Sequence, residues 1–228
     1  MIGRKLTLYE YGYLVEYCSR DLASLTPRAE AWAEKLAAMQ RWYAARGRLF
    51  VYVLTPSKAG TYPGDIPPGW PCPASQADRD GMLPMYRAAL QRNGVTTVDG
   101  PALLEAAKAH YPFALFPRGG THWNWVGAAL ATQALIRVID AARPGALPPF
   151  TFTWSDAPPV DTDRDLTNLL NMPFPRLDYR APAVALQAAA PAAARHRGGG
   201  RQLHLPPGLP IGAAALPALH RVLHLLPA

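Results

Sequence analysis

The chain has 228 residues, and its 50% hydrophobic content is sufficient for a packed core in one large domain or two small ones. Its net charge of +7 does not indicate a nucleic-acid partner, because residues 1–179 carry 18 basic and 16 acidic side chains without a basic stripe among aromatic residues. No apolar run has the length of a membrane span, no export signal follows Met1, and no phosphate-binding, dinucleotide-binding or Cys-x-x-Cys motif is present, so we expect no cofactor and no metal site.

The first expected elements lie between residues 6 and 54. Residues 6–18 have the apolar pattern of a domain interior, so we expect that the natural N-terminus of the protein lies upstream of Met1. Thr26, which a proline follows, is typical of a helix start, and residues 26–46 carry apolar side chains at three- and four-residue spacing. Residues 49–54 form an unbroken apolar run, typical of a short strand buried on both faces.

Helices and short apolar strands alternate along the rest of the domain. This alternation favours an α/β layered domain with a central, mostly parallel sheet flanked by helices. We expect helices at residues 78–93, 101–110 and 125–142, the last capped by Asn124, and strands at residues 95–98, 113–116 and 150–154, followed by an acidic loop and a short turn at residues 161–171.

The last part of the chain differs in composition from the rest. Residues 180–228 contain no Asp, Glu, Lys or aromatic residue, which is typical of a disordered tail or of GC-rich DNA translated in the wrong frame. The second interpretation is favoured, because codons that can encode Arg201 to His204 give Gly-Ser-Phe when they are read one base later. We therefore expect one domain at residues 1–179 and a low-complexity tail, disordered or out of frame, at residues 180–228.

The chain contains two cysteines, Cys18 and Cys72. By themselves they are too few for a metal site. They either pair across the segment between them, if the protein is exported, or remain two separate thiols.

His122 is the first candidate functional residue. It follows two glycines and precedes a tryptophan at an expected strand-to-helix corner, where α/β enzymes often display reactive groups. A histidine by itself is also often an ordinary packed or capping residue. Lys58 follows the strand at residues 49–54, at the carboxyl end, where open parallel sheets place their sites.

An ordered series of short motifs spans residues 6–171. It comprises the apolar run at residues 49–54, Pro56-Ser57-Lys58, Tyr62-Pro63, Gly94-Val95, Val98-Asp99, Thr121-His122-Trp123-Asn124 and Gly127-Ala128. In this order and spacing, the series resembles the AlgX/AlgJ-type SGNH-hydrolase-like domain, whose members acetylate exported polysaccharides such as alginate. The resemblance implies a periplasmic polysaccharide O-acetyltransferase or acetylesterase-like domain, with an acetyl donor protein or a small acyl donor and with possible partners in a membrane complex.

The resemblance also implies a Ser-His-Asp triad, in which Asp-x-His-Trp supplies two members and a later glycine–serine block supplies the third. His122 matches the catalytic histidine, but Gly120 stands in the place of the aspartate and no serine block follows. Either another acceptor, a backbone carbonyl or Asp99, orients His122, or activity is impaired. Ser57 lacks a glycine elbow and is interpreted as a turn residue. The alternative function is a catalytically inactive carbohydrate-binding or scaffold module of a polysaccharide export complex.

Trp123 and Lys58 are the candidate substrate-binding residues. Trp123 either wedges the corner against the sheet or stacks on a sugar ring. Lys58 either meets the carboxylate of an anionic sugar or is a solvated loop lysine. Three alternating aspartates, Asp161, Asp163 and Asp165, resemble the start of a calcium loop but lack its later Gly and Glu, so we interpret them as a solvated face.

Overall fold

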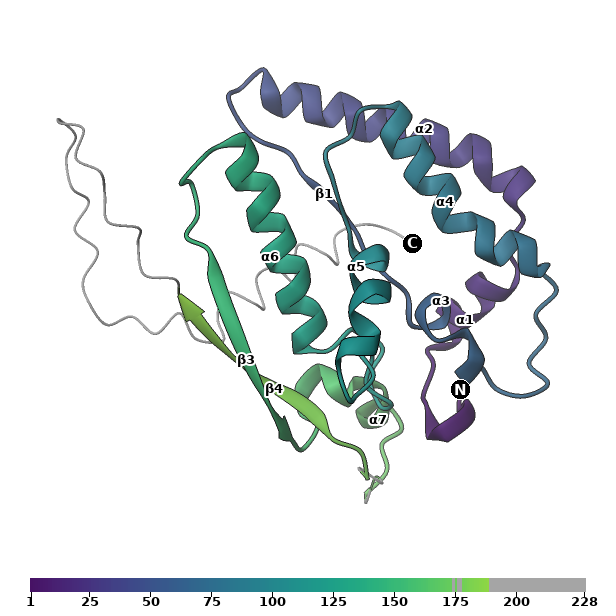
Figure 1. Cartoon of the computed structure of the whole chain (residues 1–228). Coiled ribbons are helices and arrows are strands. Elements are labelled where there is room, and N and C mark those ends of the chain that lie inside the picture. Colours follow the sequence, from purple (N-terminus) through teal and green to yellow (C-terminus); the bar gives the residue numbers. More distant parts are fainter. Residues whose placement is uncertain (174, 176–177, 189–228) are drawn as a thin grey trace.

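The computed structural model describes residues 1–173, 175 and 178–188 of the chain. Figure 1 shows the described part as a group of helices, with a long ribbon of paired strands at one side. The helices are α1 (Tyr11–Cys18), α2 (Leu22–Ala44), α3 (Lys58–Thr61), α4 (Gln76–Arg92), α5 (Gly100–Ala107), α6 (Trp125–Ala142) and α7 (Asp165–Leu169), and the strands are β1 (Tyr52–Leu54), β2 (Thr97–Asp99), β3 (Phe150–Ala157) and β4 (Ala181–Ala188).

Two strand pairs are present among the described residues. β1 lies parallel to β2, with Val53 opposite Val98, whereas β3 and β4 are antiparallel along their whole length. The parallel pair, with helices packed around it, confirms the predicted α/β class. The carboxyl ends of β1 and β2 lead directly into α3 and α5, so this edge of the parallel pair carries Lys58 and Asp99.

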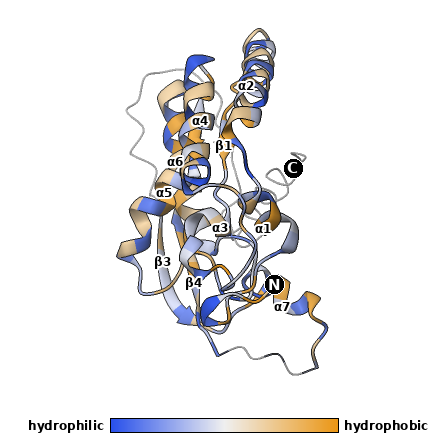
Figure 2. Cartoon of the chain, turned by 90° about the vertical axis from the view of Figure 1, so that its right-hand side faces the viewer, coloured by the Kyte–Doolittle hydropathy of each residue, from blue (hydrophilic) through white to orange (hydrophobic). Residues whose placement is uncertain are grey.

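The helices α2 and α4 lie side by side and enclose one hydrophobic cluster (Figure 1). Figure 2 shows hydrophilic and hydrophobic turns next to each other along α2, as expected for a helix with one buried face. The predicted start at Thr26 is wrong, because α2 begins at Leu22. The carboxylate of Asp21 accepts a hydrogen bond from the backbone N–H of Ala23 (3.0 Å), and this cap begins the helix one turn earlier, with Pro27 inside it.

The strand predicted at residues 113–116 does not form in the described structure. Its backbone groups bond to side chains and to a loop instead of a neighbouring strand. The backbone N–H of Leu115 donates to the hydroxyl of Tyr62 (2.9 Å), and Asn124 donates to the carbonyls of Leu115 (2.7 Å, backbone N–H) and Ala114 (3.0 Å, Nδ2). The segment at residues 113–116 is therefore a loop whose carbonyls bind Asn124 at the start of α6.

α6 has the predicted bounds, and Asn124 is confirmed as its cap through a hydrogen bond from the backbone N–H of Gly127 to Oδ1 (3.1 Å). Contrary to the expectation from composition, α6 is long and apolar enough to cross a membrane by length and hydropathy alone. Core helices of globular domains pass the same test. Here 28% of the helix is buried, including Val126, Ala129 and Ala134, and it packs against β2, α5 and the β3–β4 ribbon.

β4 lies beyond the domain boundary expected at residue 179. It pairs residue by residue with β3, from Ala157 opposite Ala181 to Phe150 opposite Ala188, and it also contacts α6. Residues 181–188 are therefore part of the domain sheet structure despite their low-complexity composition. The rest of the expected tail, including the segment from Arg201 to His204, lies outside the described residues.

Cys18 and Cys72 form a disulfide, with a Cα–Cα distance of 4.3 Å. Of the two alternatives that the sequence left open, the structure has the paired one. The bond joins the end of α1 to the loop before α4, and the backbone N–H of Ala74 donates to the carbonyl of Cys18 (2.9 Å) beside it. The N-terminal segment is thereby held against the core near α3.

Candidate active site

His122 lies in the turn before α6, and its partner comes from a distant part of the chain. Its Nδ1 is 2.6 Å from Oδ2 of Asp165, the first residue of α7. The two side chains are 25% and 28% exposed, so the pair is shielded but reachable from solvent. Because an ionised carboxylate only accepts hydrogen bonds, Nδ1 of His122 is the donor in this bond.

Two backbone groups hold the carboxylate of Asp165. The N–H groups of Thr121 and Leu166 donate to its Oδ1 at 2.8 and 2.7 Å. Burial by itself would raise the pKa of Asp165, but the hydrogen bonds from His122 and Thr121 outweigh it, so that the pKa is lowered. The carboxylate is therefore ionised at neutral pH and can stabilise a protonated His122.

The sequence did not predict Asp165 as a site residue. The interpretation of the aspartates as a solvated face is wrong for Asp165 and for Asp163, which is only 1% exposed. Of the acceptors considered for His122, Asp99 caps α5 through the backbone N–H of Ala102 (2.9 Å) and pairs with Arg87 (3.1 Å). The only available signal for Asp165 was a row of carboxylates directly before a short helix.

Gly120 has no room for the aspartate that the family motif would place there. A Cβ added at this position would lie 2.2 Å from the carbonyl oxygen of Thr162 and 3.0 Å from Cγ of Pro117. The segment that delivers Asp165 therefore occupies the space beside Gly120. The orienting carboxylate comes from position 165, and position 120 has to remain a glycine for that segment to approach.

Comparisons with known proteins decide the family. The sequence model of the family described as "SGNH hydrolase-like domain, acetyltransferase AlgX" matches residues 17–203. This chain belongs to that family. The predicted resemblance to the AlgX/AlgJ type is confirmed, and the match extends past the boundary that we expected at residue 179. No curated protein matches the chain.

Two solved structures share the fold of this AlgX-family domain. The O-acetyltransferase domain of Pseudomonas putida AlgJ is 22% identical, with a TM-score of 0.55, over 82% of this chain and 65% of that chain. Pseudomonas aeruginosa AlgX is 14% identical, with a TM-score of 0.56, over 82% of this chain and 44% of that chain. At these identities the likeness shows the fold alone, and the chain spans less than two thirds of either protein.

The two predicted substrate-binding residues are both buried in the AlgX-family domain. Trp123 is 7% exposed and packs in a hydrophobic cluster with Leu104 and Val126. Lys58 is 6% exposed, so the alternative of a solvated loop lysine is wrong. Burial lowers the pKa of Lys58 to about 7, against the opposing effect of the carboxylates of Asp165 and Asp65. A direct sugar contact by either residue stays a prediction.

None of the serines of this chain lies in a glycine–serine block after His122. The chain has five serines, and none follows Ser155, which lies on β3. The other four hydroxyls bond within helix ends: Ser19 to the carbonyl of Val15, Ser24 to that of Asp21, Ser57 to the N–H of Gly60, and Ser75 to Asp78. Among the described residues, no three His, Cys, Asp or Glu side chains gather closely enough to hold a metal ion.

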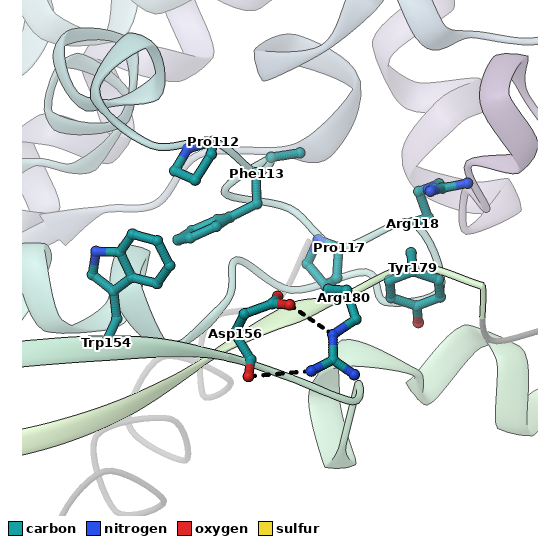
Figure 3. Close-up of a pocket in the computed structure, with 9 residues that line it drawn as sticks. Pro112, Phe113, Pro117, Arg118, Trp154, Asp156, Tyr179 and Arg180 are labelled. Atoms are coloured by element: carbon teal, nitrogen blue, oxygen red, sulfur yellow. Dashed lines mark hydrogen bonds and ion pairs between the residues drawn. The ribbon is translucent and has the colours of Figure 1, made fainter.

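A pocket of about 510 Å³ opens between the segment before His122 and the β3–β4 ribbon (Figure 3). In Figure 3, the rings of Phe113 and Trp154 lie edge to face at one end, with centroids 4.8 Å apart and an interplanar angle of 83°. Trp154 is 39% exposed. The rest of the lining combines apolar residues such as Pro117 with Arg118 and with Arg180, whose Nε donates to Asp156 (2.8 Å). Apolar rings beside charged groups suit a ligand with both apolar and polar faces.

Asp163 is a buried carboxyl that fixes the segment carrying Asp165. Its Oδ2 accepts a hydrogen bond from the backbone N–H of Val160 (3.2 Å), its main-chain carbonyl accepts one from the hydroxyl of Tyr179 (2.6 Å), and its Oδ1 is buried without a partner in the described part of the chain. Burial raises the pKa of Asp163 to about 6.

We expect Gly120→Ala to lower the free energy of unfolding by about 1–3 kcal/mol, because its methyl group would meet the carbonyl of Thr162. Gly64→Ala is the matched control, since nothing lies within 4 Å of a Cβ there, and its effect should stay within about 0.5 kcal/mol. Urea unfolding measures both values. Equal stability of the two variants would contradict the close approach at Gly120.

We expect Asp163→Asn to remove a pH dependence of stability. The unfolded carboxyl loses its proton near pH 3.8 and the folded one near 6, so the folded state holds the extra proton between these values and is destabilised as the pH rises through this window. The variant should therefore gain up to about 3 kcal/mol relative to the wild type between pH 4 and pH 7. Urea unfolding at both pH values measures it, with the exposed Asp80→Asn as control. If the difference in the free energy of unfolding between the variant and the wild type is the same at both pH values, the raised pKa of Asp163 is contradicted.

Proposed function

We propose that this domain acts on acetyl esters of polysaccharide hydroxyls, as an O-acetyltransferase or acetylesterase-like domain, with His122 as the proton acceptor. The single observation that carries the proposal is the hydrogen bond from His122 to the ionised carboxylate of Asp165. This bond keeps the imidazole in one tautomer and stabilises its cation after proton uptake. In well-studied triads, loss of the corresponding carboxylate lowers turnover by roughly 10⁴-fold.

Acetyl transfer needs a group that acts first as a base and then as an acid. His122 would first remove a proton from the attacking hydroxyl and then return it to the oxygen of the leaving alcohol. In family members this attacking group is a serine, whereas here no serine follows Ser155. An acetyl-serine intermediate is therefore not part of the proposal for this chain. The proposed reaction is direct attack on the acetyl ester by a water molecule or an acceptor hydroxyl, from which His122 takes the proton. We expect this reaction to be slow.

The polysaccharide would lie across the pocket beside the β3–β4 ribbon. An exposed indole such as that of Trp154 offers an apolar face for the C–H groups of a sugar ring, and Arg118 offers hydrogen-bond donors for hydroxyl or carboxylate groups. The acetyl group would come from a donor protein or a small acyl donor. The disulfide between Cys18 and Cys72 supports an oxidising compartment such as the periplasm, where a membrane complex for polysaccharide export could hold the domain.

The second candidate is a carbohydrate-binding or scaffold module without catalysis. It is favoured by one observation, the absence of any serine after residue 155 in the sequence. Under this candidate, the pocket binds the glycan and the pair of His122 and Asp165 joins α7 to the start of α6.

We expect His122→Ala and Asp165→Asn to lower the rate of p-nitrophenyl acetate hydrolysis at least about tenfold. The wild type should release p-nitrophenol without an initial burst, because no acetyl-serine intermediate is expected. Because free imidazole side chains also cleave this ester, His110→Ala is the control, since His110 is exposed and lies on the turn after α5. Its rate should equal that of the wild type. Equal rates for all four proteins would reject the catalytic proposal and leave the binding candidate.

We expect Trp154→Ala to weaken retention on an immobilised alginate column by several-fold, because the variant removes the apolar face of the pocket. Trp42→Ala is the matched control, since Trp42 is 51% exposed on α2, outside the pocket. The amount of salt that elutes each protein measures the effect. If both variants elute with the wild type, the pocket is not the glycan site.

A further inference from the structure

The buried side-chain nitrogen of Lys58 is surrounded by backbone carbonyl oxygens. Its Nζ donates to the carbonyls of Leu8 (2.8 Å), Pro117 (2.6 Å), Arg118 (3.1 Å) and Gly120 (2.7 Å). One of these carbonyls comes from the N-terminal segment. The other three belong to the turn that leads into His122.

An ammonium group suits such a set of acceptors. It has three N–H donors in a compact head and no acceptor, and hydrogen bonds from a charged donor are about twice as strong as neutral ones. The four carbonyls replace the water that the charge loses on burial. Without the ammonium, several carbonyls would face one another in a buried space without a donor, which is unfavourable.

One peptide unit connects Lys58 to the dyad, which is the hydrogen-bonded pair of His122 and Asp165. The carbonyl of Gly120 accepts a hydrogen bond from Lys58, and the N–H of Thr121, at the other end of the same peptide bond, donates to Asp165. Because a peptide unit is planar and stiff, fixing its carbonyl also fixes the direction of its N–H. His122 is the next residue and bonds to the same carboxylate.

We infer that Lys58 is a positioning residue, which holds the peptide between Gly120 and Thr121 and thereby sets the geometry of His122 and Asp165. The donors of Lys58 are engaged by the backbone, so contact with a sugar carboxylate would require it to leave this site. The effect on catalysis rests on the proposed function. The effect on the geometry of the dyad does not.

The test compares Lys58→Met, which keeps the length of the side chain without its charge, with the wild type. We expect the low-field proton resonance of Nδ1–H in His122 to be lost or broadened, and kcat for p-nitrophenyl acetate to fall roughly 10- to 100-fold with KM unchanged. Lys35→Met, on the exposed side of α2, is the control and should change neither value. An unchanged resonance, or a raised KM with an unchanged kcat, would overturn the inference.

Chemical rescue covers the case in which Lys58→Met does not fold. Lys58→Cys is alkylated in urea with 2-bromoethylamine, which restores an ammonium at nearly the native length, or with iodoacetamide, which adds a neutral amide, and is then refolded. Only the first reagent should restore the Nδ1–H resonance. Equal recovery with both reagents, or recovery with neither, would overturn the inference. If the resonance depends on Lys58 but no protein hydrolyses the ester, only the proposed function fails.

Discussion

Close packing of two backbone segments decides where the candidate base lies and what it bonds to. The turn at residues 117–122 contacts the segment at residues 160–167 so closely that a Cβ at Gly119 would lie 2.3 Å from the hydroxyl oxygen of Thr167. The backbone N–H of Thr167 donates to the carbonyl of Gly119 across this contact (3.0 Å). Two adjacent glycines therefore allow α7 to begin beside His122. Without this approach, the imidazole would lose its hydrogen bond to Asp165.

The same contact explains how a family triad can change its parts while its geometry remains useful. A carboxylate must lie near Nδ1 to select the tautomer, but its position along the chain is free. Here Asp165 fills this role from the start of α7, and the space for a side chain at Gly120 is lost in return. No serine follows Ser155 in the sequence. Under the proposed function, His122 and Asp165 would therefore act as one unit of base and orienting carboxylate.

The turn at residues 117–122 is also held by segments other than the one at residues 160–167. Lys58, at the start of α3, donates hydrogen bonds to carbonyls of the turn. The disulfide at Cys72, together with Tyr9, holds the N-terminal segment over α3. The hydroxyl of Tyr9 donates to the carbonyl of Tyr62 (2.9 Å) in this region. Segments that lie far apart in the chain therefore meet at the loop before His122.

The sequence by itself determined the α/β class, the family, the bounds of α6 and the cap at Asn124, because periodicity, caps and short motifs are local properties. It did not determine the bond between His122 and Asp165, which joins residues 43 positions apart, or the strand at residues 181–188, whose composition is that of a low-complexity tail. Only the tertiary structure decided these, because strand pairing and burial depend on which distant segments meet. Burial also turned Lys58 from an expected surface group into an internal one.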